Sequence, residues 1–366
     1  MTCTARTFTA ALAAAILALA AAPAPAADLH GQLGVEAGGL DHPLGIAVEP
    51  SSPYLNGNLD LNLAAPTGAS VWKFSYSGGT YLFDPETALD FARHAVGVEW
   101  LKPAAREALT FSTGLQVSLR RNETAYSVYD YDELFWYSAL KTYPHPQLMV
   151  RGYAGLRVRR YDLLPEESYL EPHAVLELKR FWNNRTTLGA TLRAGGKWFH
   201  DEVAPNVWGT DGTPYAAQAS ASLDLAKGLS DRLGLSASAQ QRFDLAGFPY
   251  YVEADVFDSP LLDRYARSGP AVRGALKVLT AAQLWLEGGA AWRRDDYGAI
   301  LFDDGAAGAT RTDTITDLFL SLERPFLKQG KGAVLQATVT WRDQASTLPG
   351  YTWEGLTLAT GLQWRF

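Results

Sequence analysis

Long segments of this chain alternate between apolar and polar residues, and this period of two constrains the fold more than any other feature. Residues 109–120 (LTFSTGLQVSLR) show the pattern most clearly, and 185–199, 231–243 and 332–342 repeat it. Successive side chains of a β-strand point to opposite faces, so the pattern predicts strands with one apolar and one polar face. These segments exceed the five or six residues usual in globular sheets and match the roughly ten that a tilted strand needs to cross a bilayer.

The connections between the predicted strands alternate between short and long. Short ones recur near 65–69, 103–106, 144–146, 183–184, 227–230, 280 and 328–331, and longer ones lie at 38–53, 79–90, 121–125, 161–168, 200–213, 244–268, 295–311 and 343–352. Outer-membrane barrels have short periplasmic turns and long external loops. The alternation therefore predicts an antiparallel up-and-down transmembrane β-barrel with both ends of the chain on the short-turn side.

Counting segments between these connections predicts about sixteen strands, with fourteen to eighteen left open. The predicted strands are 29–37, 54–63, 70–78, 91–101, 107–120, 126–141, 147–160, 169–181, 185–199, 214–226, 231–243, 269–279, 281–294, 312–326, 332–342 and 353–366. The first two strands and the region 244–268 are the least defined, because residues 250–257 also fit a hairpin within a loop.

The N-terminal stretch has the layout of a secretory signal peptide. Arg6 precedes an apolar run over residues 10–22, and prolines and small residues follow before Asp28. The run is too short to span a bilayer. We expect residues 1–27 to be removed and residues 28–366 to form one barrel domain. The only cysteine, Cys3, would be lost with the leader, which leaves no disulfide and no thiolate metal site.

Charge and composition narrow the class of protein further. Without residues 1–27 the chain has 31 basic residues (32 − 1) against 39 acidic ones, a net charge of −8. Nucleic-acid binders are usually basic, so nucleic acid is not an expected partner. Mean hydropathy is −0.10 despite 11 Trp, 17 Tyr and 15 Phe, and no second apolar run approaches the ~20 residues of a membrane helix. This combination fits a barrel whose residues face lipid and lumen alternately.

The last strand carries the most specific motif. Leu362, Trp364 and the terminal Phe366 share one face, with polar residues on the other. The segment closely resembles the C-terminal signature of bacterial outer-membrane β-barrels, including porin-like proteins. The resemblance implies an outer-membrane location, recognition of this strand by the barrel assembly machinery, and contact with outer-membrane lipid and lipopolysaccharide. It names a class of protein and no particular transporter.

Aromatic residues suggest where the membrane interfaces lie. Trp353 and Trp364 are eleven residues apart on the final strand, which at about 3.3 Å per residue and ~40° tilt spans roughly 28 Å along the membrane normal. The apolar band between the aromatic girdles of such barrels is ~25 Å tall. Trp182 and Trp198 bracket the predicted ninth strand in the same way. We therefore expect these tryptophans to mark the two interfaces.

Alternation also assigns side chains to the lumen. On the seventh to ninth strands the inward face would carry Arg151, Arg157, Arg159, Glu171, His173, Arg193 and Lys197, together with Glu177 and Lys179. Folding the two hairpins places Glu171 between Arg159 and Lys197, and His173 between Arg157 and Arg193. The facing of the strand at 126–141 stays undecided.

Two interpretations of this charged wall remain open. Rings of Arg and Lys favour anions, so the cluster fits an anion-selective constriction. The plainer interpretation is that lumen charges solvate the pore or cross-link its wall. The acidic outer loops likewise fit either divalent-cation bridges to lipopolysaccharide or ordinary solvated loops.

The chain shows no motif of an enzyme or of a cofactor site. None of the six histidines stands in a recognisable serine-rich or paired-carboxylate motif, and no nucleotide-binding glycine loop or clustered metal ligands occur. The leading expectation is a porin-like channel for passive or weakly selective passage of small polar or anionic solutes, without cofactor or metal. The alternatives are the outer-membrane barrel of a polysaccharide or protein export system, and a closed structural or adhesive barrel. A homo-oligomer and export-system partners both remain open.

Overall fold

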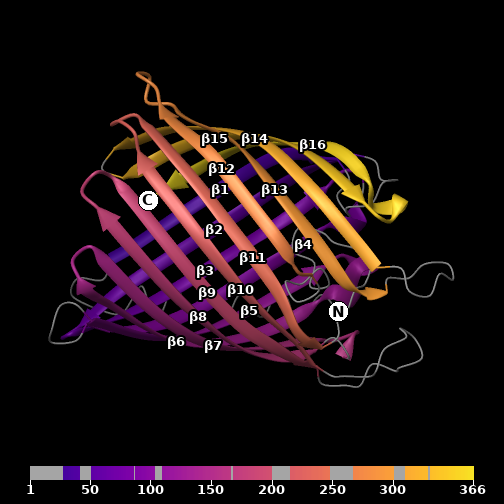
Figure 1. Cartoon of the computed structure of the whole chain (residues 1–366), viewed down its shortest axis with the longest axis horizontal. Helices are drawn as coiled ribbons and strands as arrows, with labels where there is room; N and C mark the ends of the chain where they lie inside the picture. The colour runs from indigo at the N-terminus through magenta and orange to yellow at the C-terminus, as the bar shows by residue number, and fades with distance from the viewer. Residues whose placement is uncertain are drawn as a thin grey trace.

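Sixteen antiparallel strands form a closed barrel (Figure 1). The computed structural model describes residues 28–41, 51–85, 87–103, 109–165, 168–199, 215–247, 267–300, 310–328 and 330–366. The strands are β1 Asp28–Leu40, β2 Ser52–Thr67, β3 Ser70–Phe83, β4 Phe91–Pro103, β5 Leu109–Asn122, β6 Tyr131–His145, β7 Leu148–Tyr161, β8 Tyr169–Trp182, β9 Thr186–Phe199, β10 Tyr215–Gly228, β11 Leu233–Gly247, β12 Gly269–Leu279, β13 Trp285–Ile300, β14 Thr310–Lys328, β15 Lys331–Ser346 and β16 Trp353–Arg365. Each strand pairs with its neighbours in sequence, and β1 closes the ring on β16.

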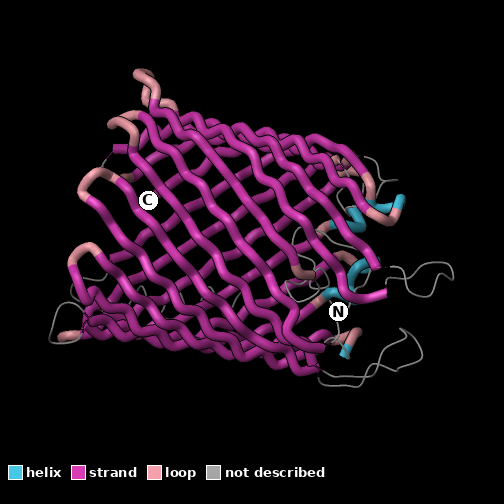
Figure 2. The backbone as a smooth tube through the Cα atoms, in the orientation of Figure 1, coloured by secondary structure: helices cyan, strands magenta, loops and turns pink. Residues whose placement is uncertain are grey.

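The predicted strand count and the alternation of connections are confirmed. Short turns gather at the end of the barrel where the C-terminus lies, and the longer connections gather at the other end (Figure 2). Three 3₁₀ helices, η1 Thr87–Leu89, η2 Thr124–Tyr129 and η5 Pro349–Tyr351, lie at that other end. In the described part of the chain, no helix has the length and apolar character needed to cross a bilayer. The predicted leader 1–27 and the alternative hairpin 250–257 lie outside the described residues.

Two predicted strands start four or five residues too early, and the second, third, sixth, eleventh, thirteenth and fifteenth are predicted to end four to six residues too soon. The sixth strand begins at Tyr131 rather than at residue 126, because Thr124–Tyr129 winds into η2. Asp130 fixes this junction, since its Oδ1 accepts hydrogen bonds from the backbone and side-chain nitrogens of Asn122 at 2.7 and 3.0 Å. The thirteenth strand begins at Trp285 rather than at residue 281, because a turn after Thr280 precedes it.

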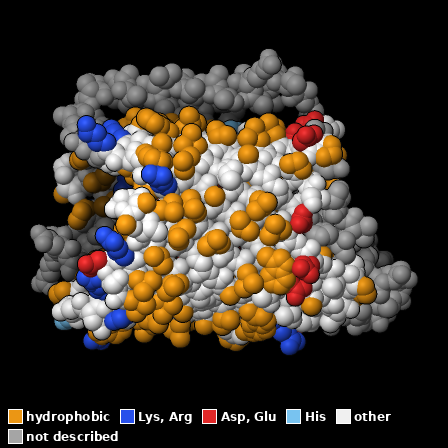
Figure 3. Space-filling view, turned by 90° about the horizontal axis from the view of Figure 1, so that it is seen from above, with side chains coloured by type: hydrophobic (Ala, Val, Ile, Leu, Met, Phe, Trp, Pro, Cys, Tyr) orange, Lys and Arg blue, Asp and Glu red, His pale blue; other side chains and the backbone are white. Residues whose placement is uncertain are grey.

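The two faces of the sheet separate as the period of two predicts. Leu33, Leu192, Leu223 and Leu320 on the outer face are each 52–56% exposed, whereas Glu171 on the inner face is fully buried. Apolar side chains are spread over the visible outer surface between the two ends (Figure 3). A face of this kind is stable against lipid, so the fold is that of a transmembrane barrel.

The expected aromatic girdle is only partly correct. Trp198 and Trp364 point outward and are 48% and 53% exposed. Trp353 lies on the opposite face, because a separation of eleven residues is odd and each step along a strand reverses the side-chain direction. Its ring lies 6.0 Å from the guanidinium of Arg342, which pairs with Asp317 on the inner wall. Trp353 therefore lines the inner face and marks no membrane interface.

The seam between the first and last strands depends on a glycine. Gly31 and Phe366 exchange backbone hydrogen bonds of 3.0 Å in both directions. The Phe366 ring lies over Gly31 in the space that a side chain at that position would fill. The terminal residue of the assembly motif thus packs at the closure of the ring.

We expect Gly31→Val to displace the Phe366 ring and to destabilise the folded barrel by about 1–3 kcal/mol, the usual cost of overpacking. The measurement is the temperature at which the compact folded band disappears in heat-modifiability gels. Gly39→Val is the matched control, since no atom lies within 4 Å of a Cβ built at Gly39. Equal stability of the two variants would contradict a packing role for Phe366 at the seam.

The orientation of the barrel predicts which turns are accessible from outside the cell. We expect Gly350→Cys, in the connection between β15 and β16, to react with a membrane-impermeant maleimide on intact cells. Ser230→Cys, in the short turn between β10 and β11, should react only after lysis. The opposite labelling pattern would invert the barrel in the membrane.

Candidate functional site

A network of charges joins β6, β7 and β8 on the inner wall. Arg157 donates from Nη1 to Glu171 Oε2 at 3.0 Å, and its Nε lies 3.4 Å from Glu133 Oε2. Arg159 donates to the same Glu133 oxygen from Nε and Nη2 at 2.9 and 2.6 Å. His173 Nδ1 lies 3.7 Å from Glu171 Oε1. Two carboxylates on different strands are thus each held by arginines of the strand between them.

Tyrosines bury this network. Tyr161 and Tyr169 are each 2% exposed and Tyr131 is 7% exposed. Arg159 lies 4.0 Å from the Tyr131 ring centroid, and Lys197 Nζ lies 3.8 Å from that of Tyr169. We refer to Glu133, Arg157, Arg159, Glu171 and Lys197, with these three tyrosines, as the buried cluster. Glu171 is 0% exposed and Lys197 is 3% exposed, so the cluster cross-links the wall and offers little charge to a passing solute.

The predicted register is off by two residues for Glu171 against β7 and for His173 against both β7 and β9, whereas Glu171 lies level with Lys197 as predicted. Glu171 stands opposite Arg157, and Arg159 stands opposite Tyr169. His173 lies between Gly155 and Gly195 rather than between Arg157 and Arg193. The register of this hairpin is set by the connection after Tyr161, where the Tyr161 backbone donates to Ser168 Oγ at 3.0 Å. Strand periodicity assigns the face of a residue but does not measure this connection.

The sequence does not identify Glu133 and Tyr131, because alternation leaves the facing of β6 undecided, nor Tyr161 and Tyr169, which stand at the ends of β7 and β8 beside a connection. Tyr131, Glu133, Phe135 and Tyr137 share the inner face, paired in register with the inward residues of β7. The outer face of β6 carries Leu134, Trp136 and Leu140, each 44–47% exposed. Leu134 and Leu140 lie on the same face and indicate that this face meets lipid. Aromatic residues on both faces of β6 obscure this pattern in the sequence.

Next to the buried cluster, four rings stack along the inner wall. Phe135 and His173 are parallel within 7° at a centroid distance of 5.6 Å, and Phe135 stacks on Tyr137 at 5.7 Å. Tyr153 closes the group at 5.6 Å from Tyr137 and 5.5 Å from His173. His173 is therefore packed among aromatic rings on one side and against Glu171 on the other.

Two further predicted residues are not in the buried cluster. Arg151 lies 3.9 Å from Glu177, whose other oxygen lies 2.5 Å from Lys179. This group is closer to the short-turn end and is partly exposed. Arg193 is exposed on the inner face of β9, and no carboxylate of the described residues lies within ion-pair distance of it. The predicted positive wall thus divides into the buried cluster, the partly exposed Arg151 and Lys179 beside Glu177, and Arg193, which is accessible and has no ion-pair partner among the described residues.

Arg193 lines a polar pocket on the inner wall of β9 to β11. The pocket has a volume of about 210 Å³. Its polar lining residues are Arg193, Gln218, Ser220, Gln240, Arg242 and Arg267. We call it the arginine pocket. Gln218 positions Arg267 there by donating to its carbonyl oxygen at 2.6 Å. Guanidinium, hydroxyl and amide groups together supply many donors, which suits an anion.

One buried carboxylate holds the far side of the arginine pocket. Asp295 is 0% exposed, and Arg242, Arg267 and Arg293 lie 3.4, 3.0 and 3.1 Å from its carboxylate oxygens. Gln218 also lies 3.5 Å from Asp244. Among the described residues, four arginines stand beside two carboxylates, so this part of the wall keeps an excess of positive charge: Arg193, Arg242, Arg267 and Arg293.

The wall across the lumen has a different character. In a ring of sixteen strands, β1 and β2 lie opposite β9 and β10. Neither β1 nor β2 contains a lysine or an arginine. Their inner faces carry Glu36, Asp60, Asn56, Asn58 and Asn62, as the pairing register shows. The arginine pocket thus faces a wall whose polar residues are either neutral asparagines or acidic.

No group of three or more His, Cys, Asp or Glu side chains in the described ranges is arranged to hold a metal ion. No protein-family model matches the chain, and no curated protein sequence matches it either.

Solved structures of outer-membrane proteins superpose on the barrel. The outer membrane protein OprD from Pseudomonas aeruginosa matches with a TM-score of 0.50 and 11% identity, over 93% of each chain. OccK8 (OprE) from the same organism matches with a TM-score of 0.55 and 10% identity, over 93% of this chain and 98% of that one. The fold is that of an outer-membrane β-barrel. CdiB from Acinetobacter baumannii matches with a TM-score of 0.58 and 10% identity, over 92% of this chain but 60% of that one. The porin-like architecture expected from the sequence is confirmed.

The buried cluster makes a prediction about stability. We expect Glu171→Gln to lower the free energy of unfolding by about 3–5 kcal/mol, because it leaves buried cations without their counter-charge. Glu177→Gln is the control, since its partners Arg151 and Lys179 are 45% and 41% exposed and such pairs contribute ~0–1 kcal/mol. Urea unfolding of the barrel in lipid vesicles measures both. A Glu171→Gln loss no larger than that of Glu177→Gln would contradict the stabilising role.

Proposed function

We propose that this outer-membrane barrel is a channel for small polar solutes and that its arginine pocket favours anions. Sixteen strands are about the number at which a barrel encloses an aqueous channel. The inner wall supplies polar and charged side chains along the strands that face the lumen. Fold alone does not assign a solute, so the preference is argued from the pocket.

The observation that carries the proposal is the accessible, unpaired Arg193 at the edge of the arginine pocket. The three cations of the buried cluster stand beside two carboxylates, Glu133 and Glu171, and are covered by tyrosines, so they add less to the field in the lumen than the exposed Arg193 does. Arg193 has no such partner among the described residues. A charge that faces a narrow lumen acts on a passing ion at short range, where salt screening is weak.

The opposite wall supports the same conclusion. Glu36 and Asp60 on β1 and β2 repel an anion from their side of the lumen, and the arginine pocket attracts it on the other. A solute with an anionic end and a neutral or cationic end would be oriented across the lumen. Weak, oriented attraction permits entry and release, which passage through a channel requires.

Planar-bilayer recordings test the proposal. We expect steady conductance with anion preference in a salt gradient, and we expect Arg193→Gln to reduce the anion-to-cation permeability ratio by about threefold, because a unit charge about 6 Å away in water is worth ~0.7 kcal/mol. Arg324→Gln, on the outer face of β14, is the matched control and should leave the ratio unchanged. Arg159→Gln should change it less than Arg193→Gln, since Glu133 already pairs with Arg159.

Two results would contradict the proposal. Absence of conductance from folded, inserted barrel would favour an export component or a closed structural barrel. Conductance with unchanged selectivity in Arg193→Gln would show that the arginine pocket only stabilises the wall and does not select solutes. The expectations of no catalytic role, of lipopolysaccharide and assembly-machinery partners, and of a homo-oligomer stay predictions.

A further inference from the structure

A band of small side chains crosses the outer face of the barrel at mid-height. Ser138, Ala154, Ala174, Ala194 and Ala219 stand in hydrogen-bonded register on the neighbouring strands β6 to β10. Adjacent strands are about 4.8 Å apart, so the band extends for roughly 19 Å. Small residues on five consecutive strands leave the backbone surface lower than the leucine-rich surface around it.

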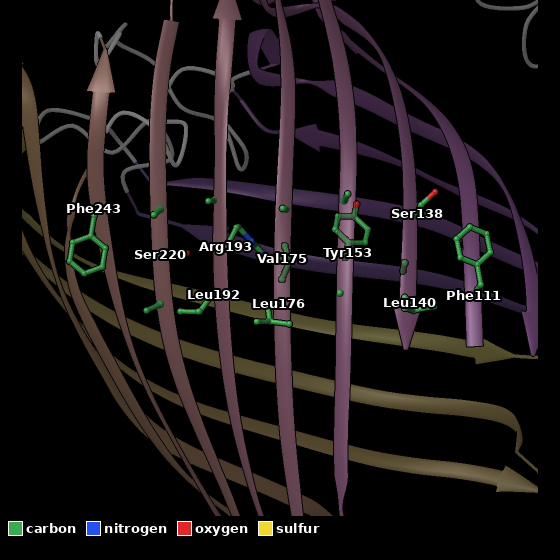
Figure 4. Close-up of a pocket in the computed structure, with 17 residues that line it drawn as sticks. Phe111, Ser138, Leu140, Tyr153, Val175, Leu176, Leu192, Arg193, Ser220 and Phe243 are labelled. Carbon is green, nitrogen blue, oxygen red and sulfur yellow. The ribbon is translucent and has the colours of Figure 1, made fainter. Parts of the chain in front are cut away.

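Larger residues turn this band into a groove. Leu140, Leu176 and Leu192 form one edge, and Phe111 and Phe243 stand at the two ends (Figure 4). The groove has a volume of about 670 Å³ and is lined almost entirely by apolar atoms. The leucines, phenylalanines and alanines of the groove belong to the lipid-facing set, so the groove opens outside the lumen. Arg193 and Ser220, which also line the arginine pocket, border the groove from the inner side of the same sheet.

Two cations lie on the same outer face, closer to the short-turn end. Arg180 follows Ala174 by six residues on β8, which is about 20 Å along the strand and ~15 Å along the membrane normal at ~40° tilt. Half of the ~30 Å hydrocarbon core is the same distance. If the groove lies near mid-membrane, Arg180 therefore reaches the periplasmic headgroup level. Lys227 on β10 stands in the next row, opposite Thr186, which pairs with Trp182.

The side chains at this level suit a phosphate. Arg180 lies 5.4 Å from the Trp182 ring centroid, and no carboxylate of the described residues is within ion-pair distance of it. Lys227 Nζ donates to the Asn184 carbonyl and to Thr186 Oγ1, each at 2.9 Å. An ammonium has three donors, so the third stays available to a ligand. Tryptophan beside cations is also typical of the membrane interface.

We propose that the groove and the basic pair Arg180 and Lys227 bind one phospholipid of the periplasmic leaflet, independently of the channel. The phosphate would accept hydrogen bonds from Arg180 and Lys227, and an acyl chain would occupy the groove over Ala174 and Ala194. Apolar contact alone does not distinguish this site from bulk lipid, because lipid tails are as apolar as leucine. Closer packing in the concave groove and the charge pairing at its headgroup end make the site selective.

Native mass spectrometry of the full barrel, released from detergent after titration with phosphatidylglycerol, tests the proposal. We expect one phospholipid to remain bound, and Ala174→Phe with Ala194→Phe to weaken its apparent affinity about tenfold, which corresponds to ~1.4 kcal/mol. Ala337→Phe, at a lipid-facing position of β15, is the matched control and should bind as the unmodified protein does. Both changes place an apolar side chain in lipid, so folding should be retained and is checked by heat-modifiable migration.

The double variant Arg180→Gln with Lys227→Gln separates the contribution of the headgroup to binding from that of the acyl chain. We expect this double variant to bind phosphatidylglycerol more weakly and to retain an uncharged diacylglycerol as the unmodified protein does. Equal binding by all variants would overturn the proposal. A change of oligomeric state in the groove variants, without a change in bound lipid, would also overturn it, because it would assign the groove to a second copy of the chain.

Discussion

The structure depends on the closure of one hydrogen-bonded ladder. In a bilayer no water satisfies backbone N–H and C=O groups, so a sheet can cross only if every strand is paired. Here fifteen hairpin neighbours in sequence and one seam, β1 with β16, satisfy that demand. The seam joins the two ends of the domain, and Phe366 covers Gly31 there. All other features of the barrel, including the separation of its faces, follow from this closure.

Closure gives the two faces different solvents, and the charges are distributed accordingly. Inside, the buried cluster holds its cations beside Glu133 and Glu171, which stabilises the wall and leaves them little influence on a solute. Around Asp295, three arginines stand beside one carboxylate, and the anion preference that we propose rests on this excess together with Arg193. The two interpretations of a positive wall therefore apply to different residues: the buried cluster fits the cross-linked wall, and the anion preference that we propose rests on the arginine pocket. Glu133 neutralises Arg159, whereas Arg193 has no comparable carboxylate among the described residues.

Outside, the same alternation leaves room for variation in side-chain size. Most lipid-facing positions carry large residues such as Leu192 and Leu223, yet β6 to β10 carry a register-aligned row of small ones. This row becomes a groove only because neighbouring strands align it. On these same strands we propose two sites, one for a soluble anion on the inner wall and one for a lipid on the outer wall.

The sequence by itself determined the barrel, its sixteen strands, the alternation of turns and the face of most side chains, because a strand reverses its side chains at every residue and the period is visible in the chain. It also placed Arg157, Arg159, Glu171 and Lys197 on one wall. Only the tertiary structure decided which of them pair. Register across a hairpin depends on how each connection folds, and this moved Glu171 from Arg159 to Arg157. It also brought Glu133 and the tyrosines of three strands together. The arginine pocket combines Arg193 with residues that are distant in the chain, namely Arg242, Arg267 and Asp295. The local periodicity of the sequence does not predict that barrel closure brings these residues together.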